Sequence, residues 1–233
     1  MQREPGKLSG PLEETPFPEQ LLGRVVTPGA APRLHGYDVE RDIAVHYGQA
    51  ELVLLALTGE LPDSRAAVLF EVACAFLSPI SVAHAPAHAA VLSRLCGTTT
   101  SATIGTAAIA LGEEARALLD DHADLLSWLA HPSESLPERH RALDADDGAA
   151  VVRLIETLAR RGVSVPELAL GPTRSAALVM VLHASGLTTR ERQEAAVAMA
   201  RFPVALAEAF AERVANFKAY PIDLPHYEYQ ESS

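Results

Sequence analysis

The fourteen residues from Thr98 to Leu111 carry no charged side chain and consist largely of threonine, alanine and isoleucine. The preceding stretch, residues 84–97, is also rich in alanine. A helix that is apolar on every side belongs in the middle of a core or at a subunit interface. Because alanine has the highest helix propensity and aromatic residues make up only 5% of the chain, we expect a fold built by stacking helices.

Stop signals divide the rest of the chain into further helices. Residues 40–58 have a broad apolar face that ends at Gly59, and Pro62 follows, which is a strong helix stop. Residues 23–39 contain two short β-branched pieces around a Pro-Gly turn and predict a small β-hairpin. The expected fold class is therefore all-α, with a small N-terminal β-hairpin and about eight helices, at residues 40–58, 63–77, 84–97, 100–111, 113–130, 149–162, 173–185 and 188–216.

The ends of the chain and one internal stretch are expected to lie outside these helices. Residues 1–22 contain four prolines among charged residues and predict a poorly ordered arm. Residues 131–148 are polar and form the one long internal loop, and loops of that length are often functional. The main domain is expected to run from residue 23 to 220, and residues 221–233 are expected to form an extended tail.

Charge and composition exclude some classes of partner. The net charge is −11 with only 19 lysines and arginines, which argues against nucleic-acid binding. No run of about 18 apolar residues is present, so no membrane span is expected. The N-terminal segment lacks an apolar signal core, and Cys74 and Cys96 lie in apolar helical contexts. A cytoplasmic location with two reduced cysteines is favoured over a disulfide.

Four segments resemble the citrate synthase and citryl-CoA lyase superfamily, and together they span roughly residues 23–230. Residues 35–64 read HGYDVERDIAVHYGQAELVLLALTGELPDS, and residues 83–112 read AHAPAHAAVLSRLCGTTTSATIGTAAIALG. Residues 138–147 read ERHRALDADD, and the C-terminal stretch reads PVALAEAFAERVANFKAYPIDLPHYEY. The resemblance implies a helical dimer and a reduced small-domain insertion around residues 113–165.

The resemblance also implies a set of site residues. The family joins or breaks a carbon–carbon bond between an acyl-CoA and a keto acid. His140 falls at the position of the histidine that polarises the keto group, so it is the predicted catalytic residue. His84 and Arg94 fall at offsets typical of the keto-acid site. Arg174 is a further candidate substrate ligand, because it stands near the start of a helix whose dipole favours anions. No tightly bound cofactor is expected, and acyl-CoA is expected only as a substrate.

Two positions depart from the family pattern. Residues 112–119 read GEEARALL where the family usually carries a histidine followed by paired glycines. Gly171 and Pro172 stand where the family's catalytic aspartate is expected, and the nearest acid, Glu167, is about one helical turn away. A site that keeps the residues that bind carboxylates but lacks a general base would bind its substrate without converting it. Loss of a general base typically costs about 10²–10⁴-fold in rate.

Three functional hypotheses follow. The first is a degenerate family member that binds a small carboxylate, keto acid or acyl-CoA, or that pairs with an intact homologue. The second is an active condensing or cleaving enzyme of the citrate type, and the third is a helical scaffold without a ligand. The expected assembly is a homodimer or a heteromer with a citrate-synthase-like homologue.

Each candidate residue also has a simpler interpretation. His84 would otherwise be a helix-start histidine, His140 a solvated loop histidine, and Arg94 a capping or interface residue. His84 and His88 have the i, i+4 spacing of metal ligands, but Pro86 lies between them and no third ligand is evident, so no metal is expected.

Overall fold

The computed structural model describes residues 22–132 and 135–211 and divides the chain after Gly48 into two compact units. The first unit contains three antiparallel strands in the order β1 (Val26–Thr27), β2 (Arg33–Leu34) and β3 (Tyr37–Asp38). The predicted hairpin is therefore confirmed and is extended by a third strand. His35 and Gly36 both have positive φ angles, of 48° and 90°, which suit the two-residue turn between β2 and β3.

The helix predicted over residues 40–58 is interrupted. The Asp38 side chain accepts hydrogen bonds from the backbone N–H groups of Glu40 and Arg41 and caps the short helix η1 (Val39–Ile43), which α1 (Ala44–His46) follows directly. Tyr47 is then extended, with φ −126° and ψ 147°. A new helix, α2, begins after Gly48, because an extended residue breaks the ladder of i→i−4 hydrogen bonds.

The second unit is helical, which confirms the all-α class. Its helices are α2 (Gln49–Thr58), α3 (Ser64–Leu77), α4 (Ala85–Leu95), α5 (Thr100–Asp121), α6 (Ala123–Ala130), α7 (Ala145–Arg160), α8 (Arg174–Ala184) and α9 (Arg190–Ala211). Two short turns, η2 (Glu138–His140) and η3 (Pro166–Leu170), lie in the connections on either side of α7.

Side-chain caps set several of the helix starts. The side chains of Asp63, Thr99 and Thr173 each accept a hydrogen bond from the backbone N–H three residues on, at the starts of α3, α5 and α8. Asp144 does the same for the N–H of Asp147 at 2.7 Å. Because Asp144 is a cap, α7 begins at Ala145, earlier than the residue 149 predicted from the apolar pattern.

Helix α5 continues past Gly112, where the sequence predicted a break. Leu111, Ala115 and Leu119 are buried at i, i+4 spacing and keep the helix against the core. Arg116 forms ion pairs with Glu113 at i−3 and with Asp120 at i+4 on the exposed side. The break comes instead at His122, where α5 ends and α6 begins.

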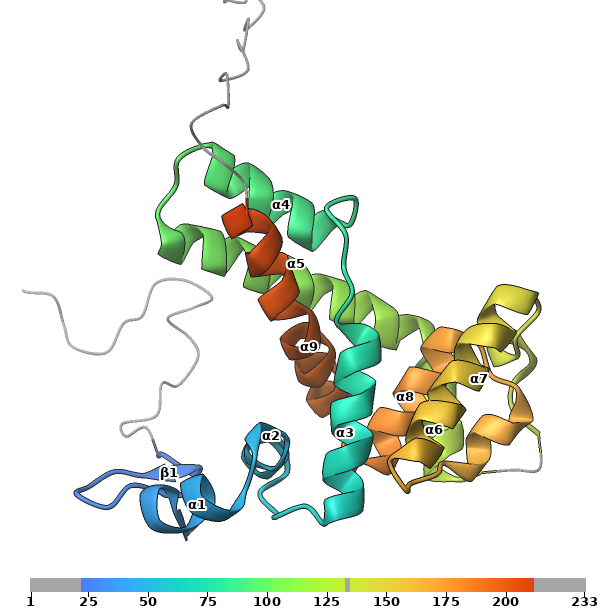
Figure 1. Cartoon of the computed structure of the whole chain (residues 1–233), viewed down its shortest axis with the longest axis horizontal. Coiled ribbons are helices and arrows are strands. Elements are labelled where there is room, and N and C mark those ends of the chain that lie inside the picture. Colours follow the sequence, from blue (N-terminus) through green and yellow to red (C-terminus); the bar gives the residue numbers. More distant parts are fainter. Residues whose placement is uncertain (1–21, 133–134, 212–233) are drawn as a thin grey trace, which may run out of the picture. The chain divides into compact units, whose positions relative to one another are not determined.

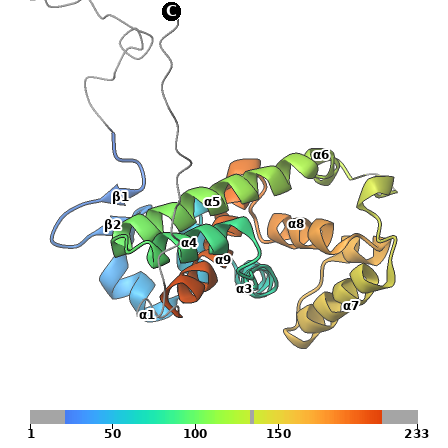
Figure 2. The same ribbon diagram turned by 90° about the horizontal axis from the view of Figure 1, so that it is seen from above.

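The helices of the second unit pack in two groups that share α5 (Figures 1 and 2). Helices α4 and α9 pack against α5, and the main core forms where α3, α6, α7 and α8 meet. Helix α8 is the most enclosed, since every residue from Ala176 to Leu182 is buried. The site described below lies where α8, α5 and α9 meet the end of α3.

Some sequence expectations fall wholly or partly outside this description. The arm over residues 1–22 is described only at residue 22, and the tail over residues 221–233 and the last helix beyond residue 211 are not described. Cys74 and Cys96 are both free thiols, and Cys96 is exposed. Among the described helices, none combines the length and apolar character needed to cross a membrane.

Helix α8 gives a test of the core. Leu182 is fully buried, so Leu182→Ala should remove about 2–5 kcal/mol of unfolding free energy by leaving a cavity. Leu143 is 91% exposed, so Leu143→Ala makes the same chemical change without opening a cavity and should be close to neutral. Urea unfolding followed by circular dichroism measures both. Equal losses in the two variants would contradict the position of α8 in the core.

Candidate functional site

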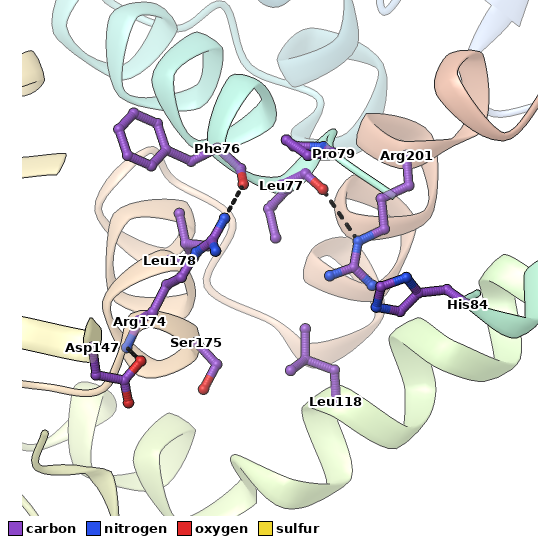
Figure 3. A pocket seen from close by; sticks show the side chains of 10 residues that line it. All are labelled: Phe76, Leu77, Pro79, His84, Leu118, Asp147, Arg174, Ser175, Leu178 and Arg201. Atoms are coloured by element: carbon purple, nitrogen blue, oxygen red, sulfur yellow. Dashed lines mark hydrogen bonds between the residues drawn. The ribbon is translucent and has the colours of Figure 1, made fainter. Parts of the chain in front are cut away.

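A cavity of about 390 Å³ opens at the carboxyl end of α3 (Figure 3). Its walls come from the end of α3 and from α5, α7, α8 and α9, together with the residue that precedes α4. The lining residues are Phe76, Leu77, Pro79, His84, Leu118, Asp147, Arg174, Ser175, Leu178 and Arg201. The cavity therefore brings together segments that lie more than a hundred residues apart in the sequence.

Two arginines reach the carboxyl end of α3 from different helices. Arg174 of α8 donates from Nη2 to the carbonyl of Phe76 at 3.3 Å, and Arg201 of α9 donates from Nε to the carbonyl of Leu77 at 3.3 Å. The last carbonyls of a helix have no partner within it and form the negative end of its dipole. Each guanidinium has five N–H groups, so both arginines keep donors for a ligand.

Arg201 is also paired with a carboxylate. Its Nη1 lies 2.6 Å from Oε1 of Glu114 on α5, and both side chains are less than a third exposed. The other oxygen of Glu114, Oε2, is buried and accepts no hydrogen bond within the described chain. The ion pair fixes the Arg201 guanidinium at the cavity wall.

Asp147 brings a carboxylate to the cavity from the first turn of α7. Its Oδ1 accepts a hydrogen bond from the backbone N–H of Arg174 at 3.2 Å, which satisfies one of the free donors at the start of α8. Figure 3 shows Asp147, Arg174 and Ser175 on one side of the cavity and His84 and Arg201 on the other.

His84 stands at the N-cap position of α4 and lines the cavity. Its Nδ1 lies 3.1 Å from the hydroxyl of Ser81, which orients the imidazole. Its ring is therefore held at the cavity wall by a local contact, on a side chain that is otherwise exposed.

His140 is buried behind Ser175 and does not line this cavity. Its Nε2 lies 2.7 Å from Oδ1 of Asp124, and an ionised carboxylate only accepts, so Nε2 carries the proton. Arg139 also binds Asp124, with Nε 2.8 Å from Oδ2. The Arg139 guanidinium first, and the His140 ring after it, hold the pKa of Asp124 well below its ordinary value.

His122 and Ser175 connect the buried histidine to the cavity. The His122 ring stacks on His140 with 5.0 Å between centroids, and its Nε2 lies 3.1 Å from the Ser175 hydroxyl. A backbone hydrogen bond joins the segment around His140 to the start of α8, because the N–H of Thr173 donates to the carbonyl of His140 at 2.7 Å. Ser175 at the cavity thus bonds to His122, the His122 ring stacks on His140, and His140 bonds to Asp124.

The four predicted site residues thus occupy three places. His84 and Arg174 line the same cavity, while His140 lies behind it. Arg94 stands on the last turn of α4, at the opposite end of that helix from His84, and does not line the cavity.

Sequence reasoning missed four residues of the site, namely Ser175, Arg201, His122 and Asp124. Arg201 falls in an amphipathic helix, where an arginine is usually a solvated side chain. The contacts that single it out join α9 to α3 and α5, and a single sequence carries no sign of them. His122 carried no sign of its role either, because Asp120, Asp121 and Asp124 surround it in the sequence and its partner Ser175 is 53 residues away.

Comparison with solved structures identifies the fold. The structure of citryl-CoA lyase from Hydrogenobacter thermophilus superposes with a TM-score of 0.60 at 15% identity, covering 91% of this chain and 95% of that one. The chain therefore shares the fold of citryl-CoA lyase. No protein-family model and no curated protein sequence matches the chain.

Two ATP citrate lyases share this citryl-CoA lyase fold over part of their length. The Methanosaeta concilii enzyme, a variant in complex with (3S)-citryl-CoA, matches with a TM-score of 0.59 at 12% identity. The Methanothrix soehngenii enzyme, in complex with citrate and coenzyme A, matches with a TM-score of 0.57 at 11% identity. Each match covers 95% of this chain and 43% of the lyase.

Within residues 22–132 and 135–211 of this chain, no three histidine, cysteine or acidic side chains are grouped to hold a metal ion.

The buried histidine network predicts a stability effect. Asp124→Ala leaves the His140 Nε2–H without its acceptor in a buried position, so the variant should lose about 1–3 kcal/mol of unfolding free energy. Glu156→Ala removes an exposed i, i+4 ion pair with Arg160 and should change stability by less than about 1 kcal/mol. Urea unfolding measures both changes. An Asp124 variant as stable as the Glu156 variant would show that the contact with His140 has no structural role.

Proposed function

We propose that the protein binds a small di- or tricarboxylate of the citrate or oxaloacetate type in the cavity at the end of α3. The observation that carries the proposal is the convergence of Arg174, Arg201 and His84 on one cavity. Arginine matches a carboxylate with two parallel hydrogen bonds, and such charge-assisted bonds are the stronger class. These groups would concentrate positive charge locally on a chain whose net charge is −11.

The size and the carboxylates of the cavity are compatible with such a ligand. A volume of about 390 Å³ is within the usual range for a small-molecule site. Asp147 accepts from the Arg174 backbone and Glu114 is paired with Arg201, so both carboxylates already have partners. Within residues 22–132 and 135–211 the guanidinium of Arg174 has no carboxylate partner, so it is the principal anion ligand of the proposal.

The residues at the start of α8 favour binding without carbon–carbon chemistry. Gly171 or Pro172 stands where the catalytic aspartate is expected, and Gly171 adopts a left-handed conformation with φ 68°. Arg141 and Pro172 form an antiparallel bridge, which fixes this backbone close to His140. Neither glycine nor proline has an acidic group, so the family's proton abstraction has no base there. Acyl-CoA remains a possible second ligand, by analogy with the neighbour that binds citrate and coenzyme A.

Ligand binding tests the proposal directly. Citrate and oxaloacetate should raise the melting temperature of the protein by mass action. Arg174→Gln should weaken binding by roughly tenfold or more, because a hydrogen bond to a charged group contributes about 1.5–3 kcal/mol. His84→Ala should also weaken it. Arg160→Gln and His88→Ala are matched controls, because these side chains do not line the cavity, and both should bind as the wild type does.

The same titration separates the three hypotheses. If neither acid nor coenzyme A shifts the melting temperature of the folded protein, the scaffold hypothesis stands instead. Formation of citrate from acetyl-CoA and oxaloacetate, or cleavage of citryl-CoA to oxaloacetate, would show an active enzyme of the citrate type. Under the present proposal the protein binds the carboxylates and neither forms nor breaks a carbon–carbon bond.

We further propose that the protein is a homodimer through the α4, α5 and α9 layer. In the first half of α5 only Thr103, Ala107 and Leu111 are buried, although the whole stretch is free of charge. Ile109 is 73% exposed, and Leu92 and Phe210 on the neighbouring helices are also exposed. Such a large apolar area on a helix layer is typical of an interface. A heteromer with a homologue would use the same layer. The predicted cytoplasmic location is a separate part of the proposal.

Light scattering after size exclusion tests the assembly. The wild type should have the mass of a dimer, and Ile109→Asp should shift it towards the monomer, because a buried unpaired charge is costly. Val152→Asp is the matched control, since Val152 is 53% exposed on α7, outside this layer. A monomeric wild type, or equal behaviour of the two variants, would contradict the proposed interface.

A further inference from the structure

Ser175 differs from the other polar residues of the cavity because its hydroxyl is held by a buried histidine. It stands in the first turn of α8, and its Oγ lies 3.1 Å from Nε2 of His122. This is the distance expected between a nucleophile and its general base. The serine lines the cavity, while 94% of the His122 surface is covered by the fold, since only 6% of it is exposed.

The backbone fixes which nitrogen of His122 carries the proton. Nδ1 lies 2.8 Å from the carbonyl oxygen of Leu118, and a carbonyl oxygen can only accept. Nδ1 is therefore the protonated nitrogen, and Nε2 of the neutral ring has a free lone pair directed at Ser175. The Leu118 carbonyl orients the histidine in the way that a third group orients the base in nucleophilic sites.

The surroundings keep His122 neutral. Burial lowers the pKa of His122, the carbonyl of Leu118 opposes this, and His140 lowers the pKa further. The charged groups near the ring are Asp121, which raises the pKa, and Arg139, which lowers it. Asp124 bonds to His140 on the far side of the stack. A neutral imidazole is the form that can accept the serine proton.

A second hydroxyl completes the arrangement. Thr173 Oγ1 lies 3.3 Å from Ser175 Oγ and accepts a hydrogen bond from the N–H of Ala176 at 3.3 Å. The Thr173 hydroxyl can therefore donate to Ser175, while the Ser175 hydroxyl donates to His122. The serine oxygen is thus oriented towards the base on one side, and Arg174 stands next to it in the chain and on the same side of the cavity (Figure 3).

We propose that Ser175 is a nucleophile, with His122 as its general base, for hydrolysis of a carboxylate-bearing acyl thioester bound in the cavity. Ser175 Oγ forms a bond to the acyl carbon, its proton moves to His122 Nε2, and the bond from carbon to sulfur breaks. The departing thiolate takes that proton and leaves as a thiol. Water then attacks the acyl-serine, gives a proton through His122 back to Ser175, and releases the acid.

The choice of acyl group rests on the proposed carboxylate binding, whereas the nucleophile rests on the Ser175 and His122 geometry alone. A thioester of a carboxylic acid with a second carboxylate places an anion near Arg174 and Arg201 and a carbonyl within reach of Ser175. No metal, oxidant or other co-reactant is needed, since water is the only second substrate.

A serine-directed fluorophosphonate tests the nucleophile without any assumption about the substrate. We expect one covalent adduct per chain, mapped to Ser175 by peptide mass spectrometry and lost in Ser175→Ala. His122→Asn can keep a donor for the Leu118 carbonyl but has no base at Nε2, so it should slow labelling by about 100-fold or more. Ser127→Ala on the exposed face of α6 is the control and should label as the wild type does.

Should His122→Asn fail to fold, the pH dependence of labelling in the wild type replaces it. The rate should fall on acidification as one group gains a proton, with a midpoint below the ordinary pKa of histidine, because burial lowers the pKa of His122. No adduct at Ser175 in the folded protein, or labelling independent of His122 and of pH, would overturn the nucleophile. Citrate should slow labelling if the carboxylate site is real. Labelling without protection by citrate would uphold the nucleophile and reject the acyl group proposed for it.

Discussion

The candidate site depends on the backbone carbonyl groups at the end of α3, which have no hydrogen-bond partner within the helix. Arg174 and Arg201 come from different helices, and each donates to one of these carbonyls, at Phe76 and Leu77. The negative end of the helix dipole favours cations there. As a result, two guanidinium groups that the sequence separates by 27 positions stand on one cavity. Arg201 is also held at the cavity by Glu114, whereas the side-chain hydrogen bond of Arg174 goes to the end of α3.

A second constraint comes from the backbone before α8. The segment around His140 pairs with the segment around Pro172, through the Arg141 bridge and the hydrogen bond from Ala142 N–H to the Gly171 carbonyl at 2.9 Å. This pairing places His140 next to His122 and both of them behind Ser175. Gly171 and Pro172 carry no acid, and Ser175, whose hydroxyl is held by His122, lies three residues after Pro172.

The sequence predicts the start of a helix well where a capping residue marks it. Asp63 and Thr173 cap helices at the expected places, because a cap needs only residues within one turn. Gly112 was misleading, since its cost of about 1 kcal/mol in a helix is outweighed by the buried stripe of Leu111, Ala115 and Leu119. Local signals cannot reveal which helices meet in space, so Arg201 and the contact between His122 and Ser175 could be found only from the structure.

His84 was predicted from its offset in the family resemblance, and Arg174 was predicted from its place at the start of a helix; both line the cavity. The sequence resemblance pointed to His140 itself but not to its partners. These partners, Asp124 and His122, come from α6 and the end of α5. Its burial at 3% exposure removes it from direct contact with a ligand in the cavity. A polar group at that depth affects the cavity only through its neighbours. Any chemical role for the histidine network must therefore pass through Ser175, because Ser175 is the one residue of the network that lines the cavity.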